Sequence, residues 1–68
     1  MDYWSCYKDV WNFHKKYAAV NNTDDYWSGV IKDSDSIAKK YNNSVFVRNL
    51  LVAVITELEG LVKQNHAE

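Results

Sequence analysis

The stretch KKYNNS at residues 39–44 has the residue types that end one helix and begin another. Its two lysines suit the C-terminal end of a helix, where the backbone dipole is negative. Asparagine tolerates the left-handed conformation, so Asn42 and Asn43 are expected to stop the helix. Ser44 then follows as a candidate N-cap for the next helix. The stretch therefore predicts two helices joined by a short turn.

An earlier part of the chain repeats these residue types in the same order. Four blocks match: DYWS at residues 2–5 and 25–28, KD at 8–9 and 32–33, KKY at 15–17 and 39–41, and NNT at 21–23 with NNS at 42–44. Each unit begins with an acidic residue, which suits the positive N-terminal end of a helix. We interpret the blocks as two versions of one helix-plus-turn unit, produced either by a duplication or by convergence of two helix ends.

These boundaries predict three helices, at about residues 2–20, 24–41 and 45–64, with Thr23 as a second candidate N-cap. The chain has no proline and only two glycines, so little else interrupts it. Apolar residues recur at helical spacing, which is typical of an all-α, three-helix bundle. We expect a single domain over residues 1–68, with a frayed tail at 65–68. The expected core contains Trp4, Trp11, Trp27, Ile31, Leu51, Val54 and Leu58.

The first predicted helix is more apolar than a bundle requires. On a helical wheel its apolar residues sweep roughly 200°, whereas a core-facing stripe needs about 100° or a little more. Surplus apolar surface of this kind commonly marks an interface, and Tyr and Trp are enriched at binding hot spots. We therefore expect this helix to contact a protein partner, or a second copy in a homodimer, through Tyr3, Trp4, Phe13, Tyr17 and Val20.

His14 is the residue that comes nearest to a catalytic group. It lies within the apolar arc of the first helix, as a candidate general base or polar pH switch, or else as a neutral histidine packed at a boundary. Cys6 is about 12 Å away along the helix axis, too far to form a nucleophile pair with it. The chain has no CxxC, HExxH or calcium-loop pattern, and its one cysteine excludes an internal disulfide. The sequence predicts no enzyme, no metal, no cofactor and no small-molecule substrate.

Charge and hydropathy argue against nucleic-acid and membrane binding. The formal net charge is −1, whereas nucleic-acid binders usually have a basic excess. The paired lysines fall at opposite ends of two antiparallel helices, so they form no single basic stripe. The longest apolar run, residues 50–55, is far shorter than the roughly 20 residues of a membrane span. Met1–Trp4 has neither the basic nor the apolar region of a signal peptide, so we expect a cytoplasmic protein.

Three segments carry a resemblance to a known class of proteins: VWNFHKKY at residues 10–17, DYW at 25–27 and FVRNLLVAV at 46–54. In these segments the chain resembles small uncharacterised helical proteins of Gram-positive gut bacteria and of their prophages and mobile elements. The resemblance implies no activity and no catalytic residues. It suggests an accessory factor, a class in which some members inhibit host defence machinery such as CRISPR effectors.

The leading hypothesis for function is a non-enzymatic protein-interaction module that uses the aromatic-rich face of the first helix. The alternative is a phage or mobile-element inhibitor that binds a host protein of a defence system. In that alternative, acidic side chains imitate phosphate groups: Asp24, Asp25, Asp33, Asp35, Glu57 and Glu59.

Overall fold

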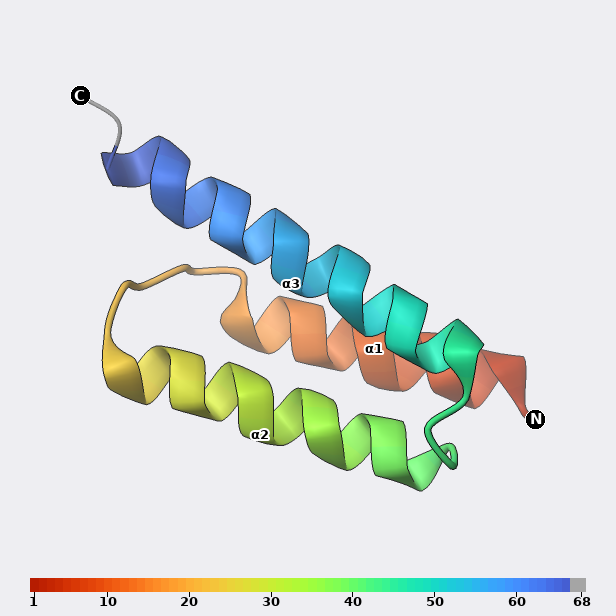
Figure 1. Cartoon of the computed structure of the whole chain (residues 1–68). Coiled ribbons are helices and arrows are strands. Elements are labelled where there is room, and N and C mark those ends of the chain that lie inside the picture. The colour runs from red at the N-terminus through yellow and green to blue at the C-terminus, as the bar shows by residue number, and fades with distance from the viewer. Residues whose placement is uncertain (67–68) are drawn as a thin grey trace.

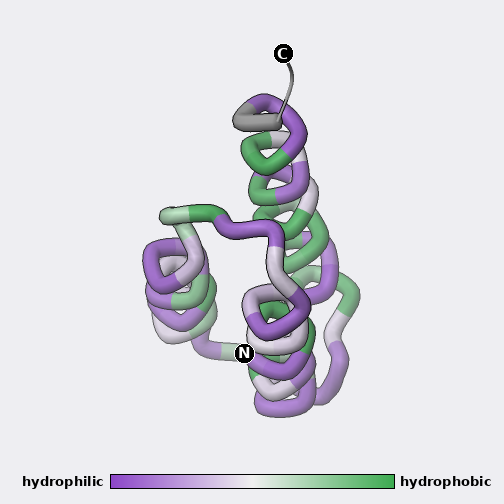
Figure 2. Tube along the Cα trace, turned by 90° about the vertical axis from the view of Figure 1, so that its left-hand side faces the viewer, coloured by the Kyte–Doolittle hydropathy of each residue, from purple (hydrophilic) through white to green (hydrophobic). Residues whose placement is uncertain are grey.

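The computed structural model describes residues 1–66, and within them the chain forms three helices: α1 (Tyr3–Tyr17), α2 (Asp24–Lys40) and α3 (Val45–His66). α2 runs antiparallel to α1 and to α3 (Figure 1), and the helices occupy the corners of a triangle (Figure 2). The predicted all-α, three-helix bundle is confirmed. α3 includes residues 65 and 66, whereas residues 67–68 of the predicted tail lie outside the described residues.

Each helix begins at a side-chain cap. Backbone N–H groups of the first turn donate to side-chain oxygens in all three helices: Ser5 to Asp2 at 3.2 Å, Tyr26 to Thr23 at 3.2 Å, and Val47 to Ser44 at 3.3 Å. The predictions of Thr23 and Ser44 as N-caps are confirmed. A cap of this kind contributes about 1 kcal/mol to stability, because it satisfies an N–H group that has no partner within the helix.

α2 ends at two asparagines, as predicted. Asn42 and Asn43 have positive φ angles of 59° and 56°. The N–H of Asn43 donates to the carbonyl of Ala38 at 2.7 Å, and the N–H of Asn42 donates to the carbonyl of Lys39 at 3.1 Å. These two bonds form a Schellman motif, which satisfies carbonyls that the helix leaves without a partner.

α1 ends at Tyr17, short of the predicted boundary at residue 20. The hydroxyl of Tyr26 donates to the carbonyl of Tyr17 at 2.7 Å, and so takes the acceptor that a longer helix would use for the N–H of Asn21. Val20 leaves the helix and packs against the core from the connecting segment. The boundary was mispredicted because a side chain of the next helix, nine residues further along the chain, bonds this carbonyl.

The core combines side chains from all three helices: Cys6, Val10, Phe13, Tyr17, Val30, Ala38, Val47, Leu51 and Leu58. Four of the predicted core residues are buried or partly buried: Leu51, Leu58, Trp27 and Val54. Their positions confirm the predicted stripes of α3 and part of the stripe of α2.

The core predictions for Trp4, Trp11 and Ile31 are wrong, because these three side chains are exposed. The buried stripe of α1, which runs from Cys6 to Tyr17, spans only about 60° of the helical wheel. Trp4 and Trp11 lie about 130–150° from its centre. The bundle therefore buries one edge of the apolar arc of α1 and leaves the other edge outside.

Candidate functional site

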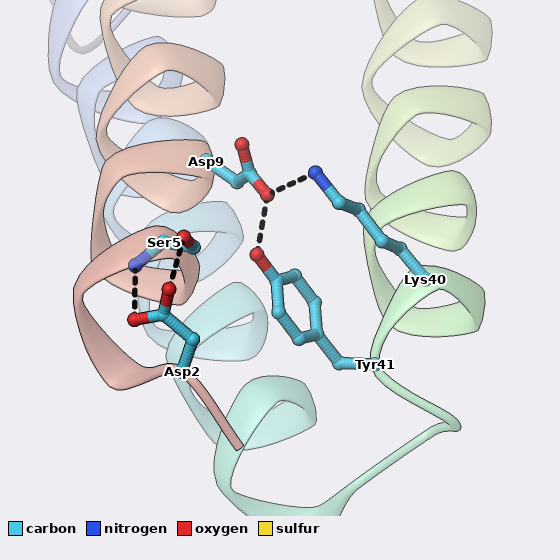
Figure 3. Close-up of polar contacts among 5 residues, drawn as sticks. All are labelled: Asp2, Ser5, Asp9, Lys40 and Tyr41. Carbon is cyan, nitrogen blue, oxygen red and sulfur yellow. Dashed lines mark hydrogen bonds and ion pairs between the residues drawn. The ribbon is translucent and has the colours of Figure 1, made fainter.

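The KD and KKY blocks of the two repeats form two reciprocal contacts between α1 and α2, which we call the clasps. The clasps join equivalent residues: Asp33 with Lys16 and Tyr17, and Asp9 with Lys40 and Tyr41. In both, the lysine Nζ lies 2.8 Å from Oδ2 of the aspartate. The tyrosine hydroxyl donates to the same oxygen, at 2.6 Å in the first clasp and 2.5 Å in the second, which Figure 3 shows.

These bonds shift the pKa values of the groups that make them. The bond from Lys40, followed by that from Tyr41, holds the pKa of Asp9 below its usual value. Lys16 and then Tyr17 lower the pKa of Asp33 in the same way. Donation to Asp9 raises the pKa of Tyr41 to about 12. At neutral pH both carboxylates are therefore ionised and the phenol is neutral, which is the pairing that the clasp requires.

A groove of about 340 Å³ lies between the clasps, along the α1–α2 interface. Its lining consists of four equivalent pairs from the two repeats: Asp9 and Asp33, Asn12 and Ser36, Phe13 and Ile37, and Lys16 and Lys40. The four charged side chains in this lining are already bonded to one another or to tyrosines. The groove therefore offers a ligand no uncommitted charge, and it is not the best candidate for a functional site.

In the folded bundle α1 is turned so that Asp9 and Lys16 point toward α2, where the clasps form. The buried stripe then faces the other two helices, and the remaining apolar edge faces outward. Four large rings lie on this outer edge, with these exposed fractions: Tyr3 58%, Trp4 73%, Tyr7 50% and Trp11 58%. We call these four residues the aromatic face.

The aromatic face is held partly in place by its neighbours. Phe46, at the start of α3, packs edge-to-face against Tyr3 and Tyr7, with ring centroids 5.3 Å and 5.7 Å apart. Trp11 meets the ring of His14 at 6.3 Å. The rings of the face leave about 350–600 Å² exposed, since an aromatic side chain carries roughly 150–250 Å². This is as large as the largest patch of a typical monomer, about 300–600 Å².

The structure places the predicted contact residues in two environments. Tyr3 and Trp4 are exposed, which leaves their predicted contact with a partner possible in this arrangement, whereas Phe13 and Tyr17 are only 4% and 9% exposed. The prediction that Phe13 and Tyr17 face a partner is wrong for this arrangement, because their side of α1 packs into the core of the bundle. Val20 is half-buried against the core, so it adds little to an outer surface.

The sequence-based choice of contact residues omitted Tyr7 and Trp11. With Trp4 they form a series at positions i, i+3 and i+7, the spacing of one helix face. That spacing was the feature that could have identified them. α1 does carry surplus aromatic surface, as predicted, but on the opposite edge of the apolar arc from Phe13.

The described residues contain no further group with evident chemistry. His14 is half-buried beside Trp11, and among the described residues it has no hydrogen-bond partner within the protein for its side chain. Cys6 is fully buried, and burial raises the pKa of its thiol. No cluster of three or more metal-binding side chains occurs between residues 1 and 66. In the same part of the chain, no helix has the length and apolar character needed to span a membrane.

Comparisons with protein-family models, with curated protein sequences and with solved structures find no match to this chain. The resemblance to small helical proteins of gut bacteria and mobile elements stays a prediction. The aromatic face is therefore interpreted from its own side chains.

Proposed function

We propose that this protein is a non-enzymatic protein-interaction module that binds a partner through the aromatic face of α1. The observation that carries the proposal is the exposure of Trp4 and Trp11, together with Tyr3 and Tyr7, on one side of one helix. Tryptophan and tyrosine dominate binding hot spots, because they bury a large area and keep a polar tip. A standard interface buries about 800 Å² on each partner, so this face supplies about half to three-quarters of one side.

The packing beneath the face supports the same function. The contacts of Phe46 with Tyr3 and Tyr7 restrict two of the four rings before any partner arrives. Immobilising a side chain at an interface costs about 0.5–1.5 kcal/mol, so rings that are already packed lose less on binding. Trp4 and Trp11 are the two largest side chains of the face, and are the expected anchors.

Site-specific photo-crosslinking in cells that express the chain tests this proposal. A photoreactive amino acid at position 4 or 11 should form adducts of discrete mass with a protein. The same amino acid at position 12, an exposed residue on the α1–α2 groove, is the control. Equal adducts at all three positions, or none at positions 4 and 11, would contradict the proposal. Molar mass by light scattering shows whether the adduct contains a second copy of the chain.

The alternative function, a host-defence inhibitor that imitates phosphates, finds less support in the ion pairs. Asp33 is bonded to Lys16 and Tyr17, and Asp35 lies 3.0 Å from Lys39. Two of the six carboxylates proposed as phosphate mimics are thus occupied within the chain. No contact in the described structure favours this function over the first.

A further inference from the structure

The acidic side chains at α1 are bonded within the chain, whereas two of its basic side chains form no ion pair within the part of the chain that the structure describes. The carboxylate of its N-cap and the one within the helix are both bonded within the chain: Asp2 accepts from Ser5, and Asp9 accepts from Lys40 and Tyr41. Lys8 and Lys15 are different, since neither forms an ion pair with any carboxylate of residues 1–66. Both are exposed. α1 therefore presents two cationic side chains and no uncommitted acid.

These two lysines border the aromatic face. On the helical wheel Lys15 lies about 20° beyond Trp4, and Lys8 about 40° beyond it. The opposite border of the face is apolar, because Phe46 of α3 packs there against Tyr3 and Tyr7. The surface thus has an aromatic centre with a basic edge on one side only.

A second copy of the chain is a poor match for this surface. If two aromatic faces packed with their α1 helices antiparallel, the basic edges of the two copies would meet, and if they packed parallel, each basic edge would meet an apolar border. α1 has no free carboxylate to offset them, and like charges brought together at an interface are unfavourable.

We infer that the aromatic face binds an acidic amphipathic helix of another protein, with an apolar stripe and carboxylates along one edge of it. This inference rests on the proposed function and names the chemistry of its partner. The i, i+3, i+7 series of Trp4, Tyr7 and Trp11 suits the seam between two helices, where anchors recur at that spacing. Carboxylates along one edge of the partner then meet Lys8 and Lys15.

Two synthetic helical peptides with the same leucine stripe test the inference. One carries glutamates along one edge of the stripe, and the other carries lysines at the same positions. Binding is followed by tryptophan fluorescence at low salt, where exposed charges are least screened. We expect the glutamate peptide to bind at least about tenfold tighter than the lysine peptide, because exchanging the sign converts two attractions into two repulsions.

The variant Lys8→Glu/Lys15→Glu should reverse this preference. Lys32→Glu/Lys63→Glu makes the same charge change on exposed side chains of α2 and α3, and should leave the preference unchanged. Circular dichroism checks that both variants remain helical. Equal affinity for the two peptides, tighter binding of the lysine peptide, or no binding of either would overturn the inference.

The outcomes also separate this inference from the proposed function. If the unaltered chain binds both peptides with equal affinity and Trp4→Ala/Trp11→Ala abolishes that binding, the face is an interaction surface but the acidic partner is wrong. Self-association of the unaltered chain, abolished by Trp4→Ala/Trp11→Ala, would overturn the inference in favour of a second copy. Binding to vesicles containing phosphatidylglycerol, with no binding of either peptide, would assign the face to a lipid surface and overturn both.

Discussion

The two copies of DYWS occupy opposite environments. Tyr3 and Trp4, in the first copy, point outward from α1, whereas Tyr26 and Trp27, in the second copy, are half-buried against the core. The hydroxyl of Tyr26 bonds the carbonyl of Tyr17, and the indole N–H of Trp27 lies 3.4 Å from Oδ1 of Asn22. The same four residues are therefore part of an exposed surface in α1 and pack against the core in α2.

The two copies differ in environment because the spacing between DYWS and KD differs by one residue. Two residues separate DYWS from KD in the first repeat, and three separate them in the second. Because the clasps fix KD and KKY in equivalent positions, the extra residue rotates the second DYWS by about 100° relative to its clasp. That rotation turns Tyr26 and Trp27 inward. The additional residue thus places the second DYWS against the core and leaves the first on the surface.

The largest effect is expected from removing the extra residue. Deletion of Ile31 rotates residues 24–30 by about 100° relative to the second half of α2 and takes Val30, which is fully buried, out of the core. The expected loss is about 4 kcal/mol or more, close to the whole stability of a small domain. Ile31→Ala is the control, with an effect below about 1 kcal/mol because Ile31 is 65% exposed. A cooperative thermal transition retained in the deletion variant would contradict this explanation.

The next largest difference is expected between Trp27 and Trp4, in what each side chain contributes to the free energy of unfolding. Trp27→Ala removes a half-buried ring and should lower the free energy of unfolding by about 2 kcal/mol, less than for a fully buried tryptophan. Trp4→Ala should change it by no more than about 0.5 kcal/mol, while it weakens partner binding. Urea denaturation measures both values. Equal losses of stability would show that Trp4 is packed in solution.

The two glycines give a smaller contrast of opposite sign. A Cβ at Gly29, which follows the second DYWS, would lie 2.8 Å from the hydroxyl oxygen of Tyr17 and would displace it from Asp33. Gly29→Ala should therefore destabilise the protein by about 1–2 kcal/mol. Gly60→Ala meets nothing within 4 Å and should stabilise α3 by up to about 1 kcal/mol. Thermal denaturation of the two variants measures both changes in stability. A Gly29→Ala variant more stable than the unaltered chain would show that the Tyr17 hydroxyl does not lie beside Gly29.

The clasps should give the smallest effects, visible in the pH dependence of stability. The pKa values of Asp9 and Asp33 are lowered in the folded protein, so their contribution is present above about pH 5 and is lost as pH falls through their folded values. Tyr41 acts in the opposite direction. Its pKa is raised to about 12, so its contribution is present below about pH 10 and is lost as pH rises toward 12.

Single substitutions separate the two limbs of that profile. Asp33→Asn should cost about 1 kcal/mol at neutral pH and should reduce the acid limb, of which Asp9 keeps its share. Tyr41→Phe should reduce the alkaline limb, and it should change the acid limb less, because Asp9 keeps its stronger bond to Lys40. Chemical denaturation across the pH range measures both. If both variants keep the full profile of the unaltered chain, other groups control it.

The local features of the fold were predictable because they depend on residues close in sequence. Thr23 and Ser44 cap helices through N–H groups three positions away, and Asn42 and Asn43 form a turn with the last residues of α2. The end of α1 was not predictable in this way, since Tyr26 supplies its cap from the next helix.

The sequence by itself determined three helices, their caps, the repeat and an apolar arc on α1 too wide for the core. It could not determine which edge of that arc faces inward, because Phe13 and Trp11 are both aromatic and a helical wheel treats them alike. The tertiary structure decided this, because Phe13 joins the core that all three helices form, while the clasps bond Asp9 and Lys16 to side chains of α2. This orientation buries Phe13 and leaves Trp11 on the surface, because the other two helices cover only one side of α1.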